Sequence, residues 1–236
     1  MHQSDARATL VICGTLPRTT RGELSRLERG PELPVTWLAP IDRLASAAAL
    51  AGRYVGCAAA LELPFAAFES RTRLRRLLTC GRDAVPGLAV VAVSGTMAAE
   101  HRGLLVEEGI RIVLVERLAE SGRGSRRPAP SGWRCQNAAW GLWEVEISAG
   151  LPRSPLAWLG LGGRPRPGGL HVLRTEALAE GNGGAVFIAS RLERQLAWAR
   201  RQVEQGRGMV VSLAGLTTRL AGDDQAARDH AILRAA

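Results

Sequence analysis

Lysine is absent from the sequence, so all 31 residues counted as Lys or Arg are arginine, and the formal net charge is +9. The codon bias of a GC-rich genome explains this lack more simply than selection for phosphate contacts, because both residues make such contacts. Aromatic residues are also few, at 4%, which argues against a surface that stacks nucleic-acid bases. Nucleic acid is therefore not the partner that we expect first.

The four cysteines are widely spaced and form no Cys-x-x-Cys pair, which excludes a zinc ribbon and a disulfide scaffold. Long apolar runs are lacking as well, since none approaches the roughly 20 residues that span a bilayer. Residues 8–15 are apolar but short, which is typical of a first strand rather than of a signal peptide. We therefore predict a cytoplasmic protein without a membrane partner.

The sequence does contain a regular alternation of apolar strands and amphipathic helices. This rhythm predicts a largely parallel sheet, open or closed, in a single domain over residues 1–236 with a polar helical tail from about residue 221. The predicted strands are Thr9–Cys13, Val35–Leu38, Tyr54–Leu63, Leu88–Val93, Ile110–Val115, Trp143–Ile147, Leu170–Leu173 and Met209–Leu213. The predicted helices are Arg21–Arg29, Arg43–Ala51, Phe68–Cys80, Ala98–Glu108, Arg191–Gln205 and a last one from Leu216, with a loop at Ser121–Gly132.

Motifs specific to a reaction are missing: there is no P-loop, no Gly-x-Gly-x-x-Gly after a strand, no His-Glu-x-x-His and no Gly-x-Ser-x-Gly. Of the four histidines, His171 alone follows a glycine-rich loop inside an apolar strand, where a side chain can face a pocket. Taken by itself, a core histidine bonded to the backbone is a better interpretation than a catalytic one. His101 lies on a helix that looks exposed. The arginines at 71–76 are most simply the solvated face of a helix.

Four of the six tryptophans fall between residues 133 and 158. An aromatic face packs well against the C–H groups of a sugar, so Trp140 is a candidate for stacking on a carbohydrate. A tryptophan that simply fills the core is the alternative, and it is the better interpretation of Trp143.

Six segments occur in a recognisable order from about Ala8 to about Leu220. They are Ala8–Gly14, Leu33–Leu38, Glu107–Arg111, Gly141–Val145, Gly169–His171, and the helix Arg191–Gln205 with the strand Met209–Leu213. In this order they resemble the NodB-homology polysaccharide deacetylases: the first and second strands, a helix–glycine–strand junction, a late strand that carries a glutamate, the strand with the last histidine, and the C-terminal helix and strand. The resemblance covers most of the chain and is carried by the order of the segments.

The resemblance implies a distorted (β/α) barrel in which one Asp and two His hold a divalent metal. In that family a second Asp acts as general base on the metal-bound water, and a late His acts as general acid on the leaving amine. His171 matches the general acid. Glu144 stands in the late strand and, with Trp140, is expected to contact the substrate.

The chain departs from the family at each metal-ligand motif. Cys13-Gly14 stands where the family has an Asp pair, and the stretch Gly56–Pro64 has Cys57 and Glu62 but no histidine. Val93–Thr96 stands where an Arg-Pro motif is usual. One thiolate or one carboxylate does not make a three-ligand site. We therefore expect no metal or other cofactor, unless a divalent metal binds a rearranged site.

Three functions follow from these observations. The first is a deacetylase-like barrel without its metal site, which binds a carbohydrate or an acetylated glycan or acts as a regulatory domain. The second is a divergent carbohydrate deacetylase or other C–N hydrolase with a rearranged centre, in which His171 acts with Glu144, Cys13 or Cys57. The third is a basic protein that binds nucleic acid or another polyanion. The sequence does not indicate an oligomeric state.

Overall fold

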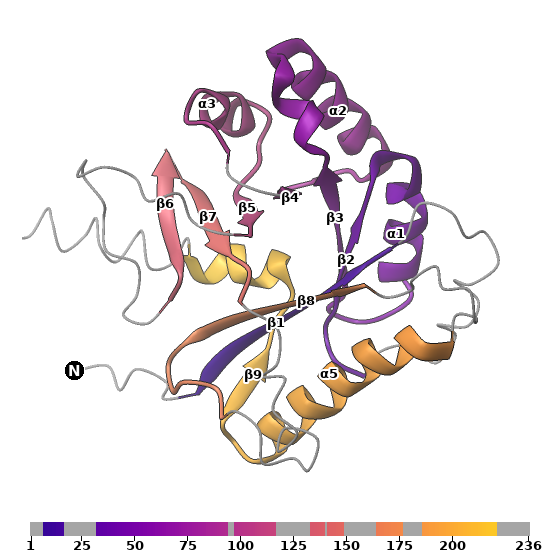
Figure 1. Cartoon of the computed structure of the whole chain (residues 1–236), viewed down its shortest axis with the longest axis vertical. Helices are drawn as coiled ribbons and strands as arrows, with labels where there is room; N and C mark the ends of the chain where they lie inside the picture. Colours follow the sequence, from indigo (N-terminus) through magenta and orange to yellow (C-terminus); the bar gives the residue numbers. More distant parts are fainter. Residues whose placement is uncertain are drawn as a thin grey trace, which may run out of the picture.

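The computed structural model describes residues 7–16, 32–93, 97–116, 133–139, 141–148, 164–176 and 186–220. In these residues the chain has a mixed α/β fold, in which a curled sheet forms a half-barrel and carries helices on its outer face (Figure 1). Within this part of the chain, no helix combines the length and apolarity needed to cross a bilayer. The predicted helix at 21–29, the predicted loop at 121–132 and the predicted tail from 221 lie outside the described residues.

The sheet has the strand order β6-β7-β5-β4-β3-β2-β1-β8, and β9 pairs with β1 off this path. All pairings among the described strands are parallel except that of β6 with β7. Their bounds are β1 (Ala8–Thr15), β2 (Thr36–Ala39), β3 (Ala58–Leu63), β4 (Val90–Val93), β5 (Ile112–Val115), β6 (Cys135–Ala139), β7 (Leu142–Glu146), β8 (Leu170–Glu176) and β9 (Gly208–Val210).

The curl of the sheet brings β7 and β8 together although they are not neighbours in the strand order. The amide of Ser148, just after β7, donates to the carbonyl oxygen of Val172 in β8 at 2.9 Å. The amide of Val172 donates in return to the Ser148 hydroxyl oxygen at 3.0 Å. These two bonds draw the ends of the half-barrel together.

The inner face of the sheet is apolar because side chains alternate between the two faces of each strand. Seven strands each contribute a residue to one buried inner cluster: Val11, Leu38, Ala60, Ala92, Leu114, Val145 and Val172. Residues 213–220 form a short helix whose Leu213, Leu216 and Leu220 pack into the same cluster. This helix therefore fills part of the space that the curled sheet encloses (Figure 1).

Helices cover the outer face of the sheet. α1 (Leu44–Ala51) and α5 (Val186–Glu204) pack with Trp37 of β2 and with Leu10 and Ile12 of β1. α2 (Arg71–Ala84) and α3 (Glu100–Glu107) pack on Val91 and Val113 of β4 and β5. Two short 3-10 helices, η2 (Ile41–Arg43) and η3 (Phe65–Glu69), precede α1 and α2.

The predicted alternation of strands and helices is confirmed in the described residues, but β3 begins at Ala58 rather than Tyr54, α5 begins at Val186 rather than Arg191, and four further corrections apply. The antiparallel strand β6 was not predicted. The predicted last strand ends early, at Val210, because the amide of Leu213 donates to the Thr36 hydroxyl oxygen at 3.1 Å and the chain turns into a helix there. The predicted helix from Phe68 is split into η3 and α2. The prediction of an exposed His101 is wrong, since its ring is buried against Phe68 with 5.2 Å between ring centroids.

Candidate functional site

The carboxyl ends of the parallel strands carry a small polar cluster on the inner face, which we call the carboxyl-end cluster. It consists of Cys13 and Thr15 of β1, Glu62 of β3 and Arg174 of β8. Arg174 is in register with Cys13 of β1, and Glu62 is in register with Ala92 of β4. Cys13 and Ala92 belong to the inner cluster, so Arg174 and Glu62 lie on the inner face as well. Parallel α/β sheets bind their ligands at the carboxyl ends of the strands, so this is the first place to look for a site.

Arg174 holds the carboxyl-end cluster together. Its guanidinium pairs with the Glu62 carboxylate through NH2, and its Nε donates to the Thr15 hydroxyl oxygen at 3.2 Å. The pair reaches across β1 and β2 to β3, because Arg174 and Glu62 lie three strands apart in the sheet. Both side chains are 20% exposed, so the ion pair is only partly withdrawn from solvent. The cluster therefore presents one cation and one anion to the solvent at this end of the sheet.

Cys13 lies beneath this ion pair and is fully buried. Burial raises the pKa of its thiol to about 12, and the nearby Arg174 guanidinium opposes that rise without cancelling it. Because the nucleophilic and metal-binding form of cysteine is the thiolate, the protonated Cys13 is suited to neither role at neutral pH.

The carboxyl-end cluster does not fit the divalent metal that the family resemblance implies. Glu62 is neutralised by Arg174, and the positive guanidinium stands where a cation would have to bind. Zinc sites need three or four thiolate, imidazole or carboxylate ligands. Within the described part of the chain, no group of three or more His, Cys, Asp or Glu residues could hold a metal ion.

The chain was also compared with protein-family models, with curated proteins and with solved structures. None of them matches it.

His171 lies away from the carboxyl-end cluster. It is in register with Leu10 near the start of β8, and Leu10 packs on the outer face while Cys13 faces inward. Its Nε2 accepts a hydrogen bond from the amide of Arg166 at 3.0 Å, which is the backbone contact expected of a structural histidine. Burial lowers the pKa of His171, so the ring is neutral at pH 7. The general-acid role stays a prediction, and a direct contact with Cys13 is ruled out because the two side chains lie on opposite faces.

Glu144 is buried in an ion pair of its own. Its carboxylate accepts from Arg102 of α3, with Nε–Oε1 at 2.7 Å and NH2–Oε2 at 3.2 Å, and from Nε2 of Gln136 in β6 at 2.5 Å. The side chain is 3% exposed, and it ties α3 and β6 to β7. Its expected contact with a substrate stays a prediction. Trp140 lies outside the described residues, and Trp143 packs in the inner cluster as a core residue.

Cys57 precedes β3, three strands from His171 in the sheet. Its half-buried sulfur accepts from the amide of Val35 at 3.4 Å, and burial raises the pKa of the thiol. His171 and Cys57 both lie on the outer face, and their short side chains do not span three strand spacings, about 14 Å, unlike the long arginine and glutamate of the carboxyl-end cluster. The predicted partnership of Cys57 with His171 therefore has no direct contact to support it.

The arginines of α2 form ion pairs with α3. Arg71 and Arg75 pair with Glu107 at 2.8 and 3.0 Å, and Arg82 and Arg75 both pair with Glu108. This part of the molecule is therefore a mixed-charge surface. A polyanion would have to compete with these carboxylates at α2, which gives no support here to the alternative of a basic, polyanion-binding protein.

Arg174 and Thr15 were missed as site residues in the sequence, while Glu62 was noted only as an isolated carboxylate. The signal that could have found them is local: each is a polar residue near the carboxyl end of an otherwise apolar strand, as in Leu61-Glu62-Leu63 and Leu173-Arg174. In the structure, Phe65 lies two residues beyond the end of β3 and is 70% exposed.

Proposed function

We propose that the chain is a carbohydrate-binding or regulatory protein with a polysaccharide-deacetylase-like barrel and without the family's metal site. The observation that carries the proposal is the carboxyl-end cluster, in which an Arg174–Glu62 ion pair and the Thr15 hydroxyl take the place of a ligand set. Hydrogen bonds in which one partner is ionised are stronger than neutral ones, so a charged guanidinium and carboxylate would bind the hydroxyl groups of a sugar well. The exposed ring of Phe65 adds an apolar face on which a sugar ring could stack.

The barrel assignment is supported by two features. Six of the strands follow one another in parallel from β7 through β5, β4, β3 and β2 to β1, and β8 completes the row. The mutual bonds of Ser148 and Val172 then join the two ends of this row. A distorted barrel has this arrangement, with its ligand end at the carboxyl ends of the strands.

Glycan binding tests the proposal directly. The folded protein is applied to an array of neutral and acetylated glycans, and binding of the best ligand is then measured by calorimetry for the Arg174→Ala, Phe65→Ala and Trp140→Ala variants. Each variant is expected to weaken binding at least about tenfold, which corresponds to the loss of about 1.4 kcal/mol. The control is Arg73→Ala, since Arg73 is exposed on α2 and forms an ion pair with Glu69.

Two outcomes would overturn the proposal. If the folded protein binds no glycan on the array, or if Arg174→Ala binds as tightly as the unmodified chain, the carboxyl-end cluster is not a carbohydrate site. The metal-free part is tested separately by elemental mass spectrometry of the untagged protein, purified without chelators. A near-stoichiometric divalent metal would overturn it and favour the hydrolase with a rearranged centre.

A further inference from the structure

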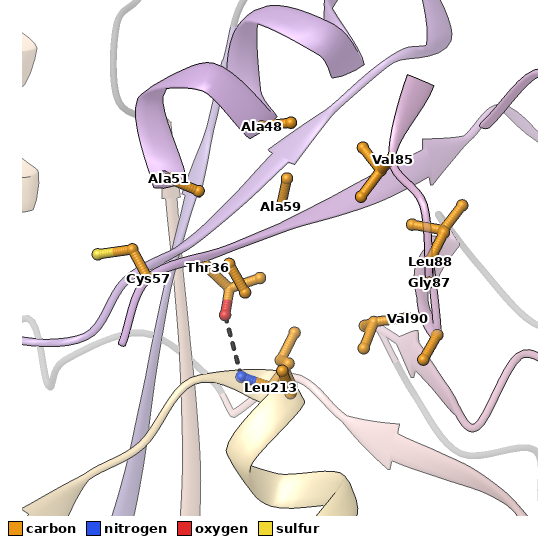
Figure 2. Close-up of a pocket in the computed structure, with 13 residues that line it drawn as sticks. Thr36, Ala48, Ala51, Cys57, Ala59, Val85, Gly87, Leu88, Val90 and Leu213 are labelled. Carbon is orange, nitrogen blue, oxygen red and sulfur yellow. Dashed lines mark hydrogen bonds between the residues drawn. The ribbon is translucent and has the colours of Figure 1, made fainter. Parts of the chain in front are cut away.

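The two ends of the curled sheet differ in charge. At the amino ends of β2, β3 and β4, a hollow is lined by small uncharged residues (Figure 2). At the carboxyl ends, by contrast, the carboxyl-end cluster presents the guanidinium of Arg174 and the carboxylate of Glu62. Of these two places, the carboxyl-end cluster is therefore the one that can distinguish a neutral ligand from a charged one.

The Arg174–Glu62 ion pair leaves hydrogen-bonding groups free for a ligand. Arg174 uses NH2 for Oε1 of Glu62 and Nε for the Thr15 hydroxyl oxygen. Within the described part of the chain, neither NH1 of Arg174 nor Oε2 of Glu62 has a partner. Because the two side chains are in contact and each is partly exposed, the cluster offers a ligand a donor and an acceptor close together.

Two neighbouring hydroxyl groups of a sugar match this donor and acceptor. One hydroxyl oxygen can accept from NH1 of Arg174 while the other hydroxyl donates to Oε2 of Glu62, since a hydroxyl group does both. An ionised carboxylate on the ligand accepts from NH1 as well, but it has no hydrogen to donate to Glu62. A carboxylate bound to Arg174 would thus lie beside the Glu62 charge without a bond to it.

The charges near the ion pair disfavour an anion although the whole chain is basic. Glu62 neutralises Arg174, and Glu116, which directly follows β5 two strands along from β3, adds a second carboxylate at this end of the sheet. Repulsion between like charges is costly at a partly buried site, because salt screens it incompletely. The net charge of +9 favours anionic ligands over the surface in general. A preference for neutral ligands therefore has to come from these local carboxylates.

We propose that Glu62 determines the specificity of the carboxyl-end cluster, by selecting uncharged sugars and excluding sugars that carry a carboxylate. The inference rests on the proposed carbohydrate function and names the class of glycan that the site takes. Arg174 donates to either kind of sugar, whereas Glu62 accepts from a neutral hydroxyl and repels an anion. Specificity of this kind requires a group that penalises the wrong ligand as well as one that binds the right ligand.

Matched pairs of glycans test this specificity. Each neutral glycan on an array is placed beside a copy whose primary hydroxyl groups are oxidised to carboxylates, and the best pair is then measured by calorimetry with the full chain. The unmodified protein is expected to bind the neutral member at least about tenfold more tightly than the oxidised member. Glu62→Gln keeps an accepting oxygen but removes the charge, so it should bind the oxidised member at least about tenfold more tightly than the unmodified protein does. This gain should shrink as salt is raised, because it depends on the charge of Arg174.

Glu69→Gln is the matched control, because the same change is made on η3 at a side chain that is 63% exposed. It should leave the affinity for both members of the pair unchanged. The proposal is overturned, with carbohydrate binding still in place, if the unmodified protein binds the oxidised member as tightly as the neutral one, or if folded Glu62→Gln gains no affinity for it. Binding of neither member of any pair would overturn the carbohydrate function and the specificity together. If circular dichroism shows that Glu62→Gln does not fold, the comparison within the unmodified protein decides.

Discussion

The buried ion pair of Glu144 with Arg102 gives the sharpest test of how the fold is held together. Replacing Arg102 with methionine keeps most of the apolar stem and removes the charge. The Glu144 carboxylate, whose side chain is 3% exposed, then loses its bonds from Arg102 and keeps the bond from the side-chain amide of Gln136. Breaking a buried ion pair from one side destabilises proteins by about 3–5 kcal/mol, because the remaining charge is uncompensated.

This loss is large enough to be measured in a chain of 236 residues. At about 2–4 °C per kcal/mol for a domain of this size, Arg102→Met should lower the melting temperature by roughly 10 °C. The free energy of unfolding is measured by urea titration followed by circular dichroism. The double variant Arg102→Met/Glu144→Met should be more stable than Arg102→Met alone, because it removes the uncompensated charge as well.

Arg73 provides the matched control. Its pair with Glu69 at 2.9 Å has similar chemistry, but the two side chains are 53% and 63% exposed. Arg73→Met should cost no more than about 0.5 kcal/mol, since exposed ion pairs on helices contribute little. If Arg102→Met loses no more stability than Arg73→Met, or if the double variant is as unstable as Arg102→Met, the buried charge of Glu144 does not need Arg102 as its partner.

Three further predictions concern single positions. Gly103→Ala should stabilise the chain by about 0.5–1 kcal/mol, because the glycine lies inside α3 with nothing within 4 Å of an added Cβ. Gly109→Ala should destabilise the chain by about 1 kcal/mol, because Gly109 has φ +78°, a left-handed conformation that an alanine side chain disfavours. Urea titration compares the two variants, and a stabilised Gly109→Ala would contradict the argument. Burial lowers the pKa of His171 below its usual value of 6.5. Just below pH 6.5 the unfolded chain therefore binds more protons at this ring than the folded chain does, and the free energy of unfolding falls as the pH drops through that range. His171→Asn should reduce the fall, as followed by melting temperature between pH 5 and 7, while an NMR pKa for His171 at or above 6.5 would contradict it. Cys13 has its pKa raised from 9.0 to about 12, so its contribution to stability is constant below pH 9 and is lost as the pH rises toward 12. Mass spectrometry after alkylation at pH 9 should find Cys13 unmodified in the folded protein, and rapid modification would contradict its burial.

The strands and helices themselves could be predicted because their signals are local. The run Leu88–Val93 contains β4, and the alanine-rich stretch that stops before Gly52 is α1, with bounds that differ by one or two residues from those expected. Both patterns depend on neighbours a few residues away, and the periodicity of buried side chains records them. The parallel arrangement followed from the same alternation, since parallel strands need a crossover between them.

β6 and Glu144 show where local signals fail. The sequence Cys135–Ala139 is neither strongly apolar nor alternating, and it becomes a strand because it pairs with β7. Glu144 alternates with Trp143 and Val145 as a solvent-facing residue would, yet α3 and Gln136 bury it. In both cases the deciding partner lies in another element: β6 becomes a strand by pairing with β7, and Glu144 is buried by Arg102 of α3, 42 residues away in the chain.

The candidate site separates the two kinds of information most clearly. That Glu62 and Arg174 each stand near the end of a strand is visible in the sequence, because the neighbouring residues within a short window show it. That they form an ion pair is visible only once the chain has folded, because 112 residues separate them in the chain. Their contact requires the strand order, the register of β8 on β1 and the curl of the sheet together. These depend on packing of the whole inner cluster, which is a property of many distant residues at once.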